Sequence, residues 1–200
     1  PLAQHVGKPA RLAVRPVQVV VRGDPLAAAD GFLSVPIHAP ATGVIREMKL
    51  IPTARGPKAE AIVLDVYAAD SQRVLYGGEQ DVEQLTPAQL ISAIQDSGMV
   101  GLGGAAFPIH AKLAGARERQ VSTLIVNGCE CEPYLTTDHR LMLEWADDLL
   151  RGIRVALHAS GAGRAILGIE DNKLDAVAAL RARFAADARI SVEAVKTKYP

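Results

Sequence analysis

The strongest constraint on the fold lies in the second half of the chain, where apolar runs alternate with amphipathic segments. Apolar runs of strand length occupy 121–126, 165–169 and 190–195, and helical periodicity spans 136–159 and 171–185. Strands that alternate with helices along a chain usually pair in parallel. We therefore predict an α/β domain with a mostly parallel sheet over residues 85–200.

The first fifty residues have a different pattern, in which short β-branched stretches are interrupted by turns. Val17–Arg22 and Leu33–His38 are expected to be strands, and Pro40–Gly43 is expected to turn the chain into a third. This pattern predicts a small β-rich module that closes at about Leu50. Residues 51–84 are expected to be a connector with one strand of its own, at 61–67.

Two helices are predicted between the β module and the first strand of the parallel sheet. Thr86 followed by Pro87 is typical of a helix start, and Gly98 of a helix end. A glycine-rich loop at 101–104 comes next, and a short helix is expected from about Pro108 to Ala114.

Composition excludes several classes of function. The net charge is zero and aromatic residues make up 4%, which argues against a nucleic-acid surface. No apolar run approaches the roughly 20 residues that span a bilayer, and no signal peptide is visible. The chain starts without a methionine, so we expect a piece of a longer protein. Cys129 and Cys131 are too few for a metal site alone and are expected to be reduced.

Four polar or glycine-rich loops are expected at one edge of the parallel sheet. Helix N-termini and the carboxyl ends of parallel strands share an edge, and open α/β sheets bind ligands there. The loops are 101–104, 127–133, 168–172 and 196–199.

The glycine loop has two interpretations that residue patterns alone leave open. Glycines let backbone N–H groups approach an anion, the following helix directs its positive dipole end there, and Lys112 adds a charge one turn in. Alternatively, the loop is a tight connection between two helices, because no strand precedes it as in dinucleotide-binding loops. Asn127, Glu130 and Glu132 can accept hydrogen bonds from ribose hydroxyls or a flavin edge, although a solvated acidic turn is the alternative.

Two long motifs resemble a known family. Residues 101–108 with Lys112 resemble the flavin motif shared by the RnfC proteins of Rnf electron transport complexes and the flavin subunit of respiratory complex I. Residues 127–134, followed by Asp138 and Arg140, resemble the second motif of that family in its Rnf form. The tail 196–200 resembles the start of a third motif, and the β module resembles the amino-terminal domain of RnfC.

The resemblance implies a barrel-sandwich-hybrid-like module followed by a Rossmann-like domain that binds FMN and accepts hydride from NADH. It implies that the phosphate and ribityl end of FMN is held by Gly101, Gly103, Gly104 and Lys112. Asn127 and Glu130 would contact the flavin, Phe107 and Glu132 would face NADH, and Tyr199 would line the cavity. No catalytic acid or base and no metal ligand is expected in this chain, because the cofactor carries the chemistry.

The implied setting is a peripheral subunit on the cytoplasmic face of a bacterial inner membrane, which works with other subunits of an ion-translocating complex. Electrons would pass to 4Fe–4S clusters beyond these 200 residues, since the family's cluster cysteines are absent here. Ala106 departs from the family by replacing a frequent glycine, and the β module lacks the lysine of related biotinyl and lipoyl carriers. Two alternatives remain: a flavin-containing cobalamin reductase, and a non-catalytic subunit that has lost flavin.

Overall fold

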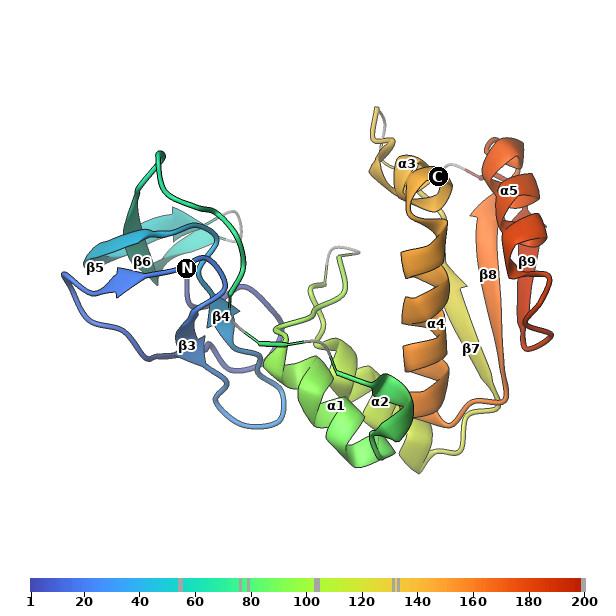
Figure 1. The fold of residues 1–200 in the computed structure, drawn as a ribbon, viewed down its shortest axis with the longest axis horizontal. Helices are drawn as coiled ribbons and strands as arrows, with labels where there is room; N and C mark the ends of the chain where they lie inside the picture. The colour runs from blue at the N-terminus through green and yellow to red at the C-terminus, as the bar shows by residue number, and fades with distance from the viewer. Residues whose placement is uncertain are drawn as a thin grey trace. The chain divides into compact units, whose positions relative to one another are not determined.

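The computed structural model describes residues 1–53, 56–75, 77–78, 80–102, 105–130, 132 and 134–198. The chain divides into two compact units, Pro1–Lys112 and Leu113–Pro200. Their positions relative to one another are not determined, so each is described by itself (Figure 1).

The first unit begins with the predicted β module, which consists of two antiparallel sheets. One sheet has the order β1-β3-β4, with strands Arg11–Leu12, Pro25–Ala28 and Ile37–His38. The other has the order β2-β5-β6, with strands Val19–Val20, Gly43–Thr53 and Gly56–Val66. A small apolar core is built from Val14, Val20, Leu26, Ala39 and Ile45.

The long hairpin β5–β6 differs from the short strands that we expected. Strand β5 continues past Leu50, and its pairing with β6 runs from Gly43↔Val66 to Thr53↔Gly56. Ile62 and Leu64 of β6 pack against the core of the module. The sheet of the module therefore includes residues that we assigned to the connector, because cross-strand pairing extends β5 through a stretch with little β pattern of its own.

Helix α1 (Pro87–Asp96) confirms the predicted start and stop signals. The Thr86 hydroxyl accepts from the N–H of Gln89, and the Gln89 side chain in turn accepts from the N–H of Thr86. A short 3₁₀ helix (Val82–Gln84) precedes it. Gly98 follows the helix with a φ of 75°, and a Cβ there would lie 2.9 Å from the Pro36 carbonyl oxygen. Both the backbone conformation and the space thus require glycine.

Helix α2 (Ile109–Glu118) is longer than the segment 108–114 that we predicted. It begins directly after an isolated antiparallel bridge between Val100 and Pro108. Gln120, with a φ of 53°, turns the chain after its end. The last turn, Gly115–Glu118, contains no large apolar residue, so the local pattern does not indicate that the helix continues past Ala114.

The second unit is the predicted parallel sheet with helices. Strands β7 (Thr123–Asn127), β8 (Arg164–Glu170) and β9 (Ile190–Val195) pair in that order, and both pairings are parallel. Helix α5 (Leu174–Phe184) connects β8 to β9. Alternate residues of β8 are buried against the helices; the core includes Ala165, Leu167, Ile169, Val177, Leu180 and Phe184.

The single helix predicted over 136–159 is wrong, because the structure has two. Helices α3 (Thr137–Glu144) and α4 (Ala146–Ser160) are separated by one residue, Trp145. The φ and ψ of Trp145, −124° and 33°, are not helical. No glycine or proline marks the break. Its cause is tertiary: α3 packs against α5, whereas α4 also packs on β8 (Figure 1).

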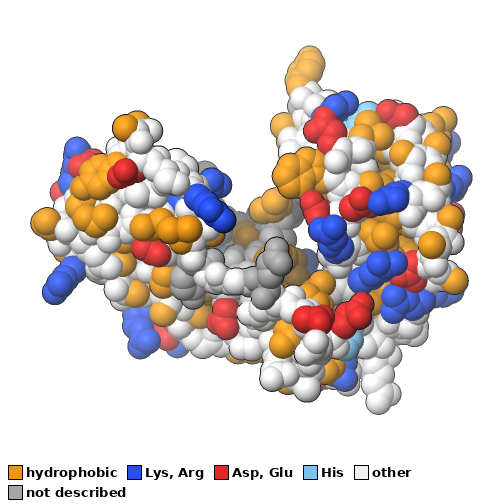
Figure 2. All heavy atoms as spheres, viewed as in Figure 1, with side chains coloured by type: hydrophobic (Ala, Val, Ile, Leu, Met, Phe, Trp, Pro, Cys, Tyr) orange, Lys and Arg blue, Asp and Glu red, His pale blue; other side chains and the backbone are white. Residues whose placement is uncertain are grey.

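Surface charge is mixed on the face shown in Figure 2. Basic and acidic side chains are interspersed within each unit and do not gather by sign. Within the described ranges no helix has the length and apolarity needed to traverse a bilayer.

Candidate functional site

The glycine loop is closed at its base by backbone pairing. Gly101 donates its N–H to the Phe107 carbonyl oxygen at 2.9 Å, and Ile109 donates to Met99 at 3.2 Å. These bonds place the loop directly at the N-terminus of α2. The Gly101 N–H is already bonded within the loop, so Gly101 can help a ligand only by leaving the space that a side chain would occupy. Gly103 and Gly104 lie outside the described residues.

Lys112 lies beside this loop, as predicted from its spacing. Its Nζ is 5.8 Å from the centre of the Phe107 ring, and a Cβ on Gly101 would lie 3.6 Å from the same atom. Glycine at 101 therefore leaves space next to the ammonium that any other residue would fill. Among the described residues, no carboxylate pairs with Lys112. Gly101, Phe107 and Lys112 thus form one small cationic corner.

His110 fixes the start of α2 to the β module and was not singled out from the sequence. Its ring is fully buried, and Nε2 lies 2.7 Å from the Phe32 carbonyl oxygen. The Phe32 and His110 rings also meet edge to face, with centroids 5.3 Å apart. Pairing with a loop 78 residues away leaves no local signal in the sequence.

The second unit confirms that three of the four predicted loops share one edge of the sheet. Gly128 donates its N–H to the Gly168 carbonyl oxygen at 2.8 Å, which joins the loop after β7 to the end of β8. Thr197 donates its N–H and its hydroxyl to Asp171 Oδ1 at 3.0 and 2.7 Å, which joins the loops after β8 and β9. These bonds hold the pKa of Asp171 below its ordinary value. The glycine loop belongs to the first unit, so its place at this edge stays a prediction.

Glu130 is largely buried, although we expected an acceptor that is open to a ligand. Its Oε1 accepts from the Asp138 N–H at 2.8 Å and its Oε2 from the His139 N–H at 3.4 Å. The carboxylate therefore caps α3, whose N-cap residue Thr136 makes no such bond. A carboxylate oxygen can accept more than one hydrogen bond, so these two bonds do not use up the acceptor capacity of Glu130.

The other predicted residues of this loop are more exposed. Asn127 Oδ1 accepts from the Cys129 N–H at 3.0 Å, which shapes the turn after β7. Glu132 is exposed. Tyr199 lies outside the described residues, as does Cys131. Among the residues described, no three His, Cys, Asp or Glu side chains gather closely enough to hold a metal ion.

A buried ion pair lies directly behind the loop after β7, and it was not identified from the sequence. Lys173 Nζ donates to Glu170 Oε2 at 2.8 Å, and both side chains are buried. The same Glu170 oxygen accepts from the Glu130 N–H at 3.2 Å. The hydrogen bond from Lys173 keeps the pKa of Glu170 below its ordinary value. The available signal was a glutamate at the end of an apolar strand, followed by a lysine three residues on.

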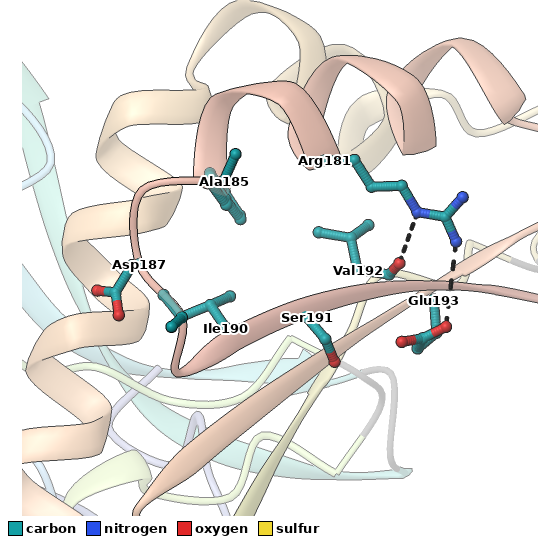
Figure 3. A pocket seen from close by; sticks show the side chains of 9 residues that line it. Arg181, Ala185, Asp187, Ile190, Ser191, Val192 and Glu193 are labelled. Carbon is teal, nitrogen blue, oxygen red and sulfur yellow. Dashed lines mark hydrogen bonds and ion pairs between the residues drawn. The ribbon is translucent and has the colours of Figure 1, made fainter.

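Two cavities lined by described residues lie away from these loops. One of about 280 Å³ lies where α5 turns into β9, at the opposite edge of the sheet (Figure 3). It is bordered by Arg181, which donates to the Val192 carbonyl oxygen at 2.9 Å. Another, of about 830 Å³, lies in the first unit between His38 and α1. Neither contains a predicted site residue.

Family models match both parts of the chain. The model of the Nuo51 FMN-binding domain matches residues 94–200, more than half of the chain. The chain belongs to this family. The model of the RnfC barrel sandwich hybrid domain matches residues 1–69, in agreement with the β module described above. The cofactor of this Nuo51-type domain is FMN.

Curated relatives match over the full length of the chain. The C subunit of the Na⁺-translocating ferredoxin:NAD⁺ oxidoreductase complex of Acetobacterium woodii is 34% identical over 200 residues. The C subunit of an ion-translocating oxidoreductase complex of Haemophilus influenzae (strain PittEE) is 39% identical over 202 residues. The matches cover all of this chain but 45% and 31% of those relatives, respectively. An NAD⁺-reducing [NiFe]-hydrogenase structure is a more distant match, with 30% identity over 55% of this chain and 20% of that one, and a TM-score of 0.47.

The residues present fit the phosphate end of FMN. A cationic side chain without a carboxylate partner among the described residues lies beside a space that a Cβ at 101 would fill. Lys112 lies in the first turn of a ten-residue helix, where the dipole also favours an anion. This donor set suits a phosphate, whereas the acceptors of the Asn127–Glu130 loop suit hydroxyl and N–H donors.

Proposed function

We propose that this chain is the FMN-binding, electron-input part of an RnfC protein, within an Rnf-type ion-translocating oxidoreductase. NADH reduces FMN, and the electrons pass to 4Fe–4S clusters in the remainder of a longer protein. The order of the two family matches and the names of the relatives support this assignment over a cobalamin reductase. The chain spans less than half the length of those relatives.

The observation that carries the proposal is the cationic corner of Gly101, Phe107 and Lys112. Lys112 and the glycines at 101, 103 and 104 hold the phosphate and ribityl end of FMN. No carboxylate pairs with this ammonium among the described residues, and charge-assisted hydrogen bonds to phosphate are stronger than neutral ones.

The remaining roles concern the ring and the hydride donor. Asn127 and Glu130 contact the flavin with their oxygen atoms. Phe107 and Glu132 face NADH, and Tyr199 lines the same cavity. FMN, when bound, supplies the hydride acceptance and the release of single electrons. The side chains bind, orient and exclude water, and none of them acts as an acid or a base.

The proposed setting rests on the relatives, which are named as subunits of oxidoreductase complexes that translocate ions. The protein is a peripheral subunit on the cytoplasmic face of a bacterial inner membrane, and its partners are the other subunits of such a complex. Because the net charge of these 200 residues is zero, we expect them to attach to the other subunits and not to anionic lipid.

The experiment is a titration of the full chain with FMN, in which binding is measured by fluorescence quenching. Lys112→Ala should weaken FMN binding by about 1–3 kcal/mol, or roughly 5- to 150-fold in Kd, because a charge-assisted contact is lost. Lys58→Ala, at an exposed lysine of β6, is the matched control and should leave Kd unchanged. An unaltered Kd in Lys112→Ala would remove the lysine from the site.

A further inference from the structure

The loop after β7 is held from behind by a buried network of charged side chains. Lys173 Nζ lies 2.8 Å from Glu170 Oε2, 3.1 Å from Asn172 Oδ1 and 3.5 Å from the Glu130 carbonyl oxygen. Glu170 Oε2 also accepts from the Glu130 N–H at 3.2 Å. Both backbone polar groups of Glu130 are therefore bound to this pair.

The pair is buried rather than on the surface. Glu170 and Lys173 are 4% and 8% exposed, and Glu130 is 7% exposed. Burying two charges costs several kcal/mol of desolvation each, and apolar residues would fill such a space at least as favourably. The pair does what apolar residues could not do, because it accepts from the Glu130 N–H and donates to the Glu130 carbonyl oxygen.

Among the described residues, the backbone bonds that join the loop to the end of the sheet are made by Gly128, which donates to Gly168, and by Glu130. The Cys129 thiol also lies 3.9 Å from the Gly168 carbonyl oxygen. From Glu130 the restraint passes on to α3, because the Glu130 carboxylate accepts from the N–H groups of Asp138 and His139. One lysine thus fixes the path of the loop and the start of the next helix.

We propose that Lys173 and Glu170 form a buried clamp that positions the 127–130 loop for contact with FMN. The two are positioning residues, since they act through Glu130 and not on the flavin. This inference rests on the proposed function, in which the loop lines the flavin site.

The chain offers a matched control at the opposite edge of the same sheet. Asp187 is 9% exposed and accepts from Arg154 at 2.9 Å and from Arg189 at 3.0 and 2.9 Å. It lies in the turn between α5 and β9 (Figure 3). Asp187→Asn thus removes a buried carboxylate from its ion pairs, although its arginine partners are about half exposed, and it does so without touching the loop after β7.

The first measurement is hydrogen exchange of the full chain without flavin. In Lys173→Met the Glu130 amide should exchange at least about tenfold faster relative to the amide of Leu167 in the core strand β8. Asp187→Asn should leave that ratio within about threefold of the wild-type value, because it lowers the stability of the whole unit and so speeds the exchange of both amides. Lys173→Arg, which keeps the charge, should restore most of the protection. An unchanged ratio in Lys173→Met would overturn the clamp.

The second measurement is FMN titration of the same variants. Lys173→Met should raise Kd about tenfold or more, and Asp187→Asn by no more than about twofold. Equal increases in both variants would mean that only stability matters and would overturn the proposal. If Lys173→Met does not fold, Glu170→Gln, which keeps the shape of the side chain, takes its place with the same expectations. A wild-type chain that binds no FMN would refute the proposed function, while the exchange ratio would still decide whether the clamp exists.

Discussion

At the level of single residues, the two motif loops contain backbone conformations that only their folded context holds in place. Ala106 has a φ of 47° and Tyr134 a φ of 66°, although neither is glycine. Left-handed conformations cost L-residues roughly 1–2 kcal/mol. In the glycine loop, the Ala106 carbonyl oxygen accepts from the Val6 N–H at 3.2 Å, which helps to hold this conformation.

Replacing Ala106 should relieve this cost. Glycine adopts a positive φ without strain but adds roughly 0.5–1 kcal/mol of unfolded-state entropy. Ala106→Gly should therefore raise the free energy of unfolding by up to about 1 kcal/mol. Urea denaturation would measure it, and a loss of stability would show that the alanine methyl makes a packing contact that outweighs the strain.

The buried glutamate should give the protein a specific sensitivity to acid. The pKa of Glu170 lies below its ordinary value of 4.5 because Lys173 donates to its carboxylate. A lowered folded-state pKa contributes stability above the unfolded pKa, and this is lost as pH falls through the folded value. The difference in unfolding free energy between wild type and Glu170→Gln should thus be largest near neutral pH and shrink below about pH 4.5. A difference that stays constant from about pH 7 to about pH 3 would contradict the ion pair.

At the level of elements, the loop after β7 approaches β8 so closely that glycine is required. A Cβ on Gly128 would lie 2.9 Å from the Gly168 carbonyl oxygen and 3.2 Å from Ile169 Cγ1. The backbone here is bonded to Gly168, so the two chain segments cannot separate without breaking that bond. Gly152 in α4 is different, since a Cβ there would meet open space.

The two glycines should therefore respond to alanine with opposite signs. Gly128→Ala should lower the free energy of unfolding by about 1–3 kcal/mol through overpacking. Gly152→Ala should raise it by about 0.5–1 kcal/mol, because alanine is the better helix former. Thermal or urea unfolding of both variants measures the pair, and a stabilised Gly128→Ala would refute the close approach.

Which elements could be predicted from sequence depends on whether their signals are local. The capping box at Thr86 and the β7, β8 and β9 strands follow from neighbouring residues. The helix break at Trp145 and the length of β5 depend on tertiary packing and strand pairing, which a local pattern does not contain. At the site, Lys112 was found by its spacing from Pro108. The role of Lys173 was missed because only its partner Glu170 is local, whereas the Glu130 backbone that it contacts is 43 residues away.

At the level of the whole molecule, we propose that a β module is followed by an α/β domain that binds FMN. The proposed division assigns residues 1–50 to the module, 51–84 to a connector and 85–200 to the FMN/NADH-binding domain, with the β5–β6 hairpin spanning the first boundary. The cationic corner belongs to the first unit, and the clamped loop belongs to the second. In this proposal the phosphate of FMN binds at Lys112, and the flavin ring contacts the loop after β7.

Hydrogen exchange of the full chain with and without FMN probes both ends of the flavin at once. We expect saturating FMN to slow exchange both in residues 99–112 and in residues 127–135, and Lys112→Ala to reduce both effects together at a fixed FMN concentration. Protection of only one of these segments, or protection of the second that persists in Lys112→Ala, would contradict the proposed FMN contacts of Lys112 and of the loop after β7.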